Sequence, residues 1–255
     1  MSIALEKIRA KTKILHSELD KIEIFRKINS PELDIKIYSD FLKILYQFYS
    51  TIEPICFKIL TESHPCSGLL RKRASLLEKD ILNLNEKLPQ SVSFDMPREI
   101  PMHYLVGMIY AIEGSALGGQ QILQNARRSL DGKIELCVNY LTTILPMPHW
   151  KKVLDFINIE LDSEQKIDEA ILGANFVFSN LAEIAKKVWT PMNAIFGFSS
   201  LLNGTDLNEE QHNYLKNISD STQTLLRIVN DILDFSKIES GKFDLESIPF
   251  LPKMF

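Results

Sequence analysis

The chain has 255 residues, 45% of them apolar and 24% charged, with a formal net charge of −4. This composition is typical of a globular domain with a smaller second one, and not of a disordered chain. No basic block could neutralise phosphates, so we expect no nucleic-acid partner. Three irregularly spaced cysteines favour the reducing cytoplasm. The N-terminus lacks a signal peptide, and the longest apolar stretch, 104–112, is far short of a bilayer span, so we expect a cytoplasmic protein with no membrane partner.

Helical periodicity dominates the chain. In the first segment Leu5, Ile8, Thr12, Leu15 and Leu19 recur at three- and four-residue steps, the spacing of an amphipathic helix. Proline and turn residues interrupt the pattern, and the longest loop between helices is predicted at residues 91–97. The later helical segments are predicted at 36–62, 68–87, 100–128, 134–145, 149–161 and 164–202. The sequence therefore predicts an all-α fold.

His16 lies on the first predicted helix, with Arg9 seven residues before it and Asp20 four residues after it. This spacing places the three side chains near one face of the helix. A neutral imidazole can ligate a metal ion through one ring nitrogen while a carboxylate one turn away holds the other. A lone histidine on such a helix is more often a surface or satisfied core residue, so the spacing alone leaves both interpretations open.

Three glycines, Gly114, Gly118 and Gly119, interrupt an otherwise apolar helical segment. Each should cost about 0.8–1 kcal/mol relative to alanine in a helix interior. A kink, or the close approach of the backbone to a flat ligand, would compensate for this cost. Tight packing between helices is the alternative explanation.

Both segments resemble haem oxygenases. Residues 5–16, Leu-Glu-Lys-Ile-Arg-Ala-Lys-Thr-Lys-Ile-Leu-His, resemble the opening helix of that family, whose proximal histidine ends the pattern L-R-x-x-T-x-x-x-H. Residues 113–120, Glu-Gly-Ser-Ala-Leu-Gly-Gly-Gln, resemble the distal helix of bacterial members associated with phytochromes. Residues 71–84 are similar to a further stretch of these proteins. The resemblance covers roughly residues 1–180.

The resemblance implies a haem site on the first helix. His16 would be the proximal iron ligand and Asp20 its supporting partner, with Thr12 also at the cofactor and Arg9 near a propionate. Such a site, with O2 and an external electron donor, would convert haem to biliverdin, carbon monoxide and iron. On the later helix that begins at Trp150, the family often carries another basic propionate contact, for which Lys152 is the candidate.

The resemblance also implies a distal catalytic segment. Gly114, Gly118 and Gly119 would let the distal helix lie against the porphyrin. Many family members have an aspartate one residue after the first of these glycines, where it organises the distal water. This chain has Ser115 at that position, a hydroxyl that can also hold water. The departure leaves open whether bound haem is turned over.

Residues 190–242 closely resemble the dimerisation and phosphotransfer hairpin of hybrid sensor histidine kinases. They read Thr-Pro-Met-Asn-Ala-Ile-Phe-Gly-Phe at the start and Asp-Ile-Leu-Asp-Phe-Ser-Lys-Ile-Glu-Ser-Gly-Lys at the end. In that family His-Glu-Leu-Arg precedes Thr-Pro, with the histidine as phosphoacceptor. Here Lys186 and Lys187 replace the histidine and the acid, so we expect no active histidine kinase.

The hairpin is expected to be a dimerisation element. Its second helix is predicted from Asn208 to about residue 238, after a turn at 204–206. An apolar seam along the two helices would be buried in a dimeric four-helix bundle, giving a homodimer through 181–240. The seam consists of Ile195, Phe198, Leu202, Leu215, Ile218, Leu225, Ile228, Ile232 and Phe235.

The sequence thus predicts three parts: a haem-oxygenase-like domain at 1–180, a degenerate kinase hairpin at 181–242 and an irregular tail at 243–255. Two functions remain open. One is a dimeric haem oxygenase. The other is a non-catalytic haem or bilin sensor whose hairpin pairs with a partner kinase or a response regulator. A third hypothesis, a related helical enzyme with a catalytic cysteine, is weaker because Cys137 has no evident basic neighbour to activate it.

Overall fold

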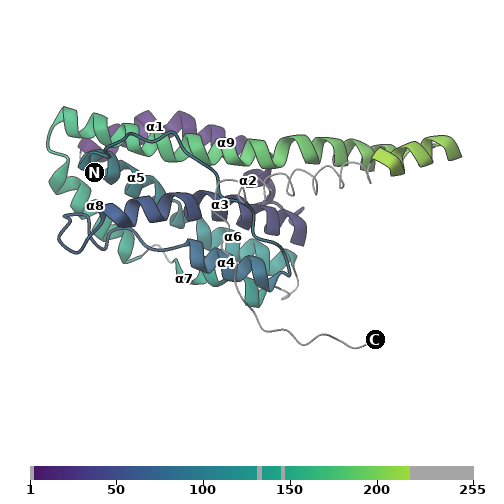
Figure 1. The fold of residues 1–255 in the computed structure, drawn as a ribbon, viewed down its shortest axis with the longest axis horizontal. Coiled ribbons are helices and arrows are strands. Elements are labelled where there is room, and N and C mark those ends of the chain that lie inside the picture. The colour runs from purple at the N-terminus through teal and green to yellow at the C-terminus, as the bar shows by residue number, and fades with distance from the viewer. Residues whose placement is uncertain (1–2, 131–133, 145–146, 219–255) are drawn as a thin grey trace, which may run out of the picture. The chain divides into compact units, whose positions relative to one another are not determined.

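The computed structural model describes residues 3–130, 134–144 and 147–218, without the side chains of 188–201 and 203 (Figure 1). Contacts divide the chain into two compact units, Met1–Thr190 and Pro191–Phe255. Within the described ranges every regular element is a helix, which confirms the predicted all-α fold. The elements are α1 (Ile3–Lys21), α2 (Glu23–Lys27), α3 (Ile35–Ile59), α4 (Ala74–Asn83), α5 (Met102–Gly114), α6 (Ala116–Ser129), the 3₁₀-helix η1 (Glu135–Cys137), α7 (Asn139–Thr143), α8 (His149–Glu160) and α9 (Glu164–Asn203).

Helix α5 forms the centre of the first unit. All ten residues from Tyr104 to Glu113 are buried, the pattern of a helix that is surrounded by others on every side. Helix α3 is amphipathic instead, and its buried face includes Tyr38, Phe48 and Ile52. Its first turn is capped by Asp34, whose carboxylate accepts a hydrogen bond of 2.7 Å from the backbone N–H of Ile37.

Helices α5 and α9 cross at backbone contact distance. A Cβ atom added to Gly107 would lie 1.8 Å from the carbonyl oxygen of Ala170, and one added to Gly173 would lie 1.9 Å from that of Tyr104. Only glycine permits this separation, because any side chain would overlap the backbone of the other helix. The ring of Tyr104 also packs on Phe176 of α9, with 6.0 Å between the ring centroids.

The predicted helix at 100–128 is divided in two by a break at Ser115. Helix α5 ends at Gly114 and α6 begins at Ala116. The hydroxyl of Ser115 donates a hydrogen bond of 2.7 Å to the carbonyl oxygen of Ile112, a local bond that competes with regular helix and bends it. Of the explanations that the sequence left open for the glycines, a break in the helix is present, at the residue between Gly114 and Ala116.

In the second unit the described residues contain the end of α9, the predicted turn, and a helical segment at 209–218. A reciprocal capping box begins this segment. The side-chain oxygen of Asn208 accepts from the N–H of Gln211 at 2.8 Å, and that of Gln211 accepts from the N–H of Asn208 at 2.9 Å. The rest of the predicted second helix, its seam residues and the predicted tail at 243–255 lie outside the described residues.

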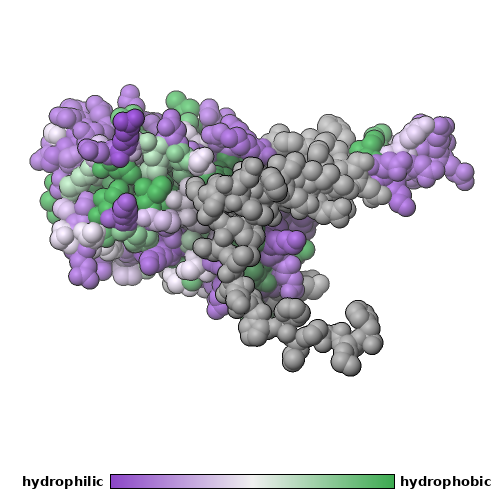
Figure 2. All heavy atoms as spheres, viewed as in Figure 1, coloured by the Kyte–Doolittle hydropathy of each residue, from purple (hydrophilic) through white to green (hydrophobic). Residues whose placement is uncertain are grey.

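The surface of the described part is largely hydrophilic on the face shown in Figure 2, with apolar side chains gathered in one area of the first unit. No described helix is both long and apolar enough to cross a membrane.

The crossing of α5 and α9 predicts an unequal response to glycine substitution. Gly173→Ala should lower the free energy of unfolding by about 2 kcal/mol or more, because the two backbones must separate to accept the methyl group. Gly118→Ala is the matched control, since its added methyl group would meet no atom within 4 Å. Urea denaturation followed by circular dichroism measures both. Equal midpoints for the two variants would show that the crossing is not constrained.

Candidate functional site

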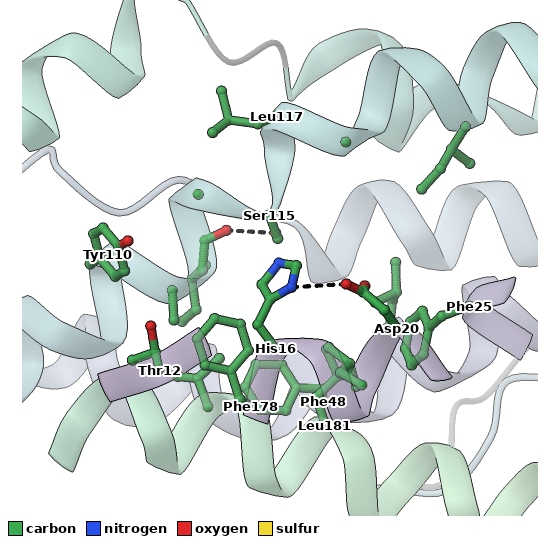
Figure 3. Close-up of a pocket in the computed structure, with 18 of the residues that line it drawn as sticks. Thr12, His16, Asp20, Phe25, Phe48, Tyr110, Ser115, Leu117, Phe178 and Leu181 are labelled. Carbon is green, nitrogen blue, oxygen red and sulfur yellow. Dashed lines mark hydrogen bonds and ion pairs between the residues drawn. The ribbon is translucent and has the colours of Figure 1, made fainter. Parts of the chain in front are cut away.

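A cavity of about 760 Å³ lies inside the first unit. Its walls come from α1, α3, the α5–α6 junction and α9, with single residues from α2, α7 and α8. Figure 3 shows His16 projecting from α1 toward the segment that carries Ser115, with Phe178 and Leu181 of α9 beside it. The cavity lining is mostly apolar, and its polar residues include His16, Asp20 and Ser115. This size and lining suit a large, mostly apolar ligand.

His16 is held in a defined orientation. Its Nδ1 lies 3.0 Å from the Oδ2 atom of Asp20, one helical turn away. Because Asp20 occupies Nδ1, Nε2 is the ring nitrogen left to bind a metal ion. The imidazole also packs against α9, where its ring and that of Phe178 meet in an edge-on arrangement with 5.5 Å between centroids. The local helical spacing alone produces the His16–Asp20 pair, as the sequence predicts.

The cationic residues that line the cavity are only partly those predicted from the sequence. Arg9 lines the cavity and hydrogen-bonds Tyr110, while burial raises the pKa of Tyr110 against the opposing effect of this guanidinium. Lys13, one turn further along α1, also lines the cavity and was not singled out from the sequence. Lys152 is exposed on α8 and lies outside the cavity wall, so the geometry gives no support to a propionate contact there.

The glycines of the distal segment have different surroundings. Gly114 and Gly118 line the cavity, together with Ser115. A Cβ on Gly118 would enter open space, and one on Gly114 would lie 3.3 Å from the ring of Trp150. Gly119 lies outside the cavity wall, and a Cβ there would meet only Leu141, at 3.7 Å. Backbone therefore faces the cavity where the sequence places the first two glycines, but not at the third.

Two tyrosines complete the polar side of the cavity. The hydroxyl of Tyr49 lies 3.4 Å from the Oγ atom of Ser115. Tyr140 also lines the cavity, and its hydroxyl is hydrogen-bonded to Tyr49 and to Arg73. Burial raises the pKa of Tyr140 well above its usual value, so this hydroxyl stays protonated. Ser115, Tyr49, Tyr140 and Arg73 thus form a chain of polar groups that leads from the cavity into the core.

That chain ends at a buried cluster of charges. Glu113 and Arg73 are fully buried and form an ion pair of 2.9 Å between Nη1 and Oε1. Arg71 adds two hydrogen bonds to Oε2 of Glu113, of 2.9 Å from Nε and 2.7 Å from Nη2. Burial alone would raise the pKa of Glu113, but Arg73 and Arg71 hold it below its usual value. The carboxylate is therefore charged, and it ties the end of α5 to the segment before α4.

Two further buried carboxylates orient this cluster and Tyr140. Glu53 of α3 accepts hydrogen bonds from the backbone N–H groups of Arg73 and Ala74. These bonds cap α4, which begins at Ala74 and not at the predicted residue 68. Asp80 accepts from the backbone N–H of Tyr140 at 2.8 Å and from Asn139. Burial raises the pKa of both carboxyls, against the effect of these hydrogen bonds. Asp80 thereby positions the tyrosine that faces the cavity.

These residues were missed from the sequence. One signal was present, since Glu113 directly follows the apolar run 104–112, and an acidic residue buried there requires a cation. Nothing in the local pattern identifies Arg73 as that cation or Tyr140 as its neighbour, because the partners come from separate segments. Within the described residues, no group of three or more His, Cys, Asp or Glu side chains could hold a metal ion.

Comparison with known proteins supports two separate relationships. The model of the His Kinase A (phospho-acceptor) domain matches residues 181–241. The sensor histidine kinase GacS of Pseudomonas protegens is 39% identical over 128 residues, 50% of this chain and 13% of GacS. The kinase BarA of Escherichia coli K12 is 34% identical over 144 residues, 54% of this chain and 16% of BarA. The chain therefore spans about a sixth or less of these relatives' length.

The fold has its own counterpart among solved structures. The NO- and CO-bound haem oxygenase from Neisseria meningitidis superposes with a TM-score of 0.54. The match covers 72% of this chain and 91% of that protein, at 18% sequence identity. The chain has a haem-oxygenase-like fold and carries a HisKA domain. The comparisons confirm the haem-oxygenase-like fold and the kinase-type domain that the sequence motifs indicated. They do not concern the chemistry at the cavity.

The buried cluster of the haem-oxygenase-like unit predicts a large stability effect. Glu113→Gln should lower the free energy of unfolding by about 3–5 kcal/mol, because Arg73 would keep its charge without a buried carboxylate. Glu86→Gln, which breaks the partly exposed pair with Lys43, is the control and should change it by less than about 1 kcal/mol. Urea denaturation at pH 7 measures both.

The difference in the free energy of unfolding between wild type and Glu113→Gln should depend on pH. Because the folded-state pKa of Glu113 is lowered, its stabilisation is complete above the unfolded value of about 4.5 and is lost as pH falls through the folded value. The gap between wild type and Glu113→Gln should therefore shrink below about pH 4.5. A gap that stays constant down to pH 3 would contradict the lowered pKa.

Proposed function

We propose that the cavity binds haem through His16 and that the protein cleaves this haem oxidatively. The observation that carries the proposal is the His16–Asp20 pair, which faces the Gly114–Ser115 break of the distal segment across a cavity of about 760 Å³. When bound, haem supplies the iron at which O2 reacts and is itself the substrate, yielding biliverdin, carbon monoxide and iron. An external donor supplies the electrons.

The residues of the cavity fit a haem group. Asp20 fixes Nδ1 of His16 and leaves Nε2 for the iron, and the histidine–carboxylate pair raises the basicity of the ligand. Gly114 and Gly118 present backbone without side chains toward the cavity, which allows a flat ring to lie close. Arg9 and Lys13 place positive charge at the wall, where propionates can be neutralised. Phe178 and Leu181 supply apolar contact.

Two hydroxyl groups are available to hold a distal water molecule. The Ser115 proton is directed to the carbonyl oxygen of Ile112, so Ser115 offers its oxygen as an acceptor. Tyr49 lies 3.4 Å from that oxygen and is hydrogen-bonded to Tyr140, which Arg73 holds in turn. By the sequence resemblance Ser115 stands where many haem oxygenases have an aspartate, and Tyr49 would supply a second hydroxyl beside it.

A hemin titration with His16→Ala tests the iron ligand. Wild-type protein should bind one hemin per chain with a Soret band that shifts and weakens in His16→Ala, because the axial imidazole is lost. His212→Ala is the control, since His212 is exposed in the second unit and should leave the spectrum unchanged. Reductant in air should then replace the wild-type Soret band by the broad red band of a bilin. Identical spectra for His16→Ala and wild type would exclude His16 as ligand.

A non-catalytic sensor is the second candidate, favoured by one observation. Leu181 lines the cavity and is also the first residue of the HisKA match. A ligand in the cavity would therefore touch the start of a signalling domain. Stable hemin binding without decay in the titration would favour this function over the oxygenase.

The hairpin is proposed to dimerise the protein without accepting phosphate. Lys186 and Lys187 stand where the kinase family has its histidine and acid, and Lys187 forms an exposed ion pair with Glu183. A protonated lysine is not a nucleophile. HisKA domains usually dimerise and relay to response regulators, so a response regulator or a partner histidine kinase is the proposed contact. We retain 1–180, 181–242 and 243–255 as the proposed domain boundaries.

Charge substitutions in the hairpin test the dimer. Leu202 and Ile218 are 48% and 46% exposed in the single chain, so glutamate at both positions should fold normally yet place charge in the apolar seam. Leu202→Glu with Ile218→Glu should convert a dimer into a monomer in sedimentation velocity. Leu172→Glu, exposed on α9 outside the seam, should leave the dimer intact. A wild-type chain that sediments as a monomer would exclude the proposed assembly.

A further inference from the structure

We propose that His149 is a positioning residue of the cavity, because it fixes the start of α8 and with it the place of Trp150 in the cavity wall. The proposal deepens the proposed function, and only its effect on haem binding rests on that function. The position of Trp150 can be measured in the chain without haem. Three observations support the inference: the contacts of the indole, the contacts of the imidazole, and the adjacency of the two residues in one helical turn.

Trp150 is the residue through which α8 reaches the cavity. Its indole lines the cavity wall and is buried, at the start of the apolar face that α8 forms with Val153 and Ile157. The six-membered ring of the indole lies against the break between α5 and α6, since a Cβ atom added to Gly114 would be 3.3 Å from its Cη2 atom. The indole therefore supports the backbone of the distal segment from outside the helix.

The same indole supports a second part of the wall. Its ring contacts that of Tyr110, with 5.6 Å between centroids and an interplanar angle of 43°. Tyr110 is in turn hydrogen-bonded to Arg9, which brings positive charge to the cavity. Side chains in a close-packed interior move when a neighbour moves. A displaced Trp150 would therefore disturb both the distal break at Gly114 and the cation at Arg9.

His149 attaches the start of α8 to the segment before α4. The N-cap residue of α8 is Pro148, which makes no side-chain hydrogen bond to the first turn. The Nε2 atom of His149 lies 2.8 Å from the carbonyl oxygen of Leu69. A carbonyl oxygen can only accept, so Nε2 carries a proton and donates it to this bond. The same nitrogen lies 3.5 Å from Oε2 of Glu113, at the buried charge cluster.

The two residues are consecutive in the first turn of α8, so the bond of one limits the movement of the other. Successive side chains of a helix point about 100° apart. This separation lets His149 reach Leu69 and Glu113 while Trp150 lies on Gly114 and Tyr110. Without the bond to Leu69, the start of α8 could shift along α5, and the indole would shift with it. His149 therefore acts on the cavity through Trp150.

Quenching of the Trp150 fluorescence by acrylamide tests the positioning in the full chain without haem. The substitution Trp189→Phe, present in every sample, leaves Trp150 as the single tryptophan. His149→Ala should raise the quenching constant about threefold or more, because a loosened indole becomes accessible through local opening. His149→Gln should behave as wild type, since its side-chain amide can still donate to Leu69. Lys151→Ala, at the exposed neighbouring position, is the control and should also leave the constant unchanged.

A hemin titration of the same samples measures the effect on the site. The dissociation constant for hemin should rise about tenfold in His149→Ala, because the wall at Gly114 and the cation at Arg9 lose their support. It should stay near the wild-type value in His149→Gln and Lys151→Ala. His149→Leu is the second variant, in case His149→Ala does not fold, because leucine fills most of the space of the imidazole but cannot donate. Circular dichroism confirms the fold of each variant.

The outcomes separate this proposal from the proposed function. Equal quenching constants for the wild-type, alanine and leucine side chains at position 149 would overturn the positioning role. An equal rise in His149→Gln would also overturn it, since the hydrogen bond to Leu69 would not be the cause. Altered quenching with unchanged hemin affinity would overturn the effect on the site. Absence of saturable hemin binding to the wild-type chain would overturn the proposed function, while the quenching result would still decide whether His149 positions Trp150.

Discussion

The buried carboxylate of Glu113 is the constraint on which the site depends. A charge in the core must be paired, because unpaired burial costs several kcal/mol. Glu113 satisfies this requirement through Arg71 and Arg73, which brings the segment before α4 against the end of α5. Glu53 then binds the backbone at Arg73 from α3. Three segments that are far apart in sequence therefore meet at one point, directly behind the break at Ser115.

This arrangement explains why the distal segment can be irregular and still well placed. Helix α5 ends at Gly114, where glycine and serine favour a bend. Without an anchor, the residues at such a bend would have no fixed position in the cavity wall. The ion pairs hold the last turn of α5, and Arg73 also hydrogen-bonds Tyr140, so the polar wall of the cavity is built on the same cluster. The cluster therefore fixes the positions of the hydrogen-bonding groups on this side of the cavity.

Helix α9 combines two roles that are usually separate. It packs on α5 through Gly173 and closes the cavity through Phe178 and Leu181, both of which belong to the haem-oxygenase-like unit. From residue 181 the same helix is part of the HisKA match. No sequence typical of a flexible linker separates the two parts. The HisKA match therefore begins inside a helix whose first half packs in the haem-oxygenase-like unit.

Local sequence determined the helices, the His16–Asp20 pair and the two family resemblances. Each of these depends on residues within a few positions of one another: period 3.6 for the helices, a four-residue step for the pair, and short contiguous motifs for the families. The break at Ser115 was also indicated locally, by the glycines beside it. The sequence did not indicate its exact residue, because that depends on a hydrogen bond of the serine hydroxyl.

Tertiary structure alone decided which distant side chains meet. Lys13 joins Arg9 at the cavity while Lys152 does not, because the direction of α8 relative to the cavity is set by packing. Gly107 and Gly173 look like ordinary helix interruptions in the sequence. In the structure they allow the backbones of α5 and α9 to come into direct contact. Tyr49, Tyr140, Arg73 and Glu113 come from four separate segments. Their association follows from the need to pair buried polar groups, a requirement that no local pattern records.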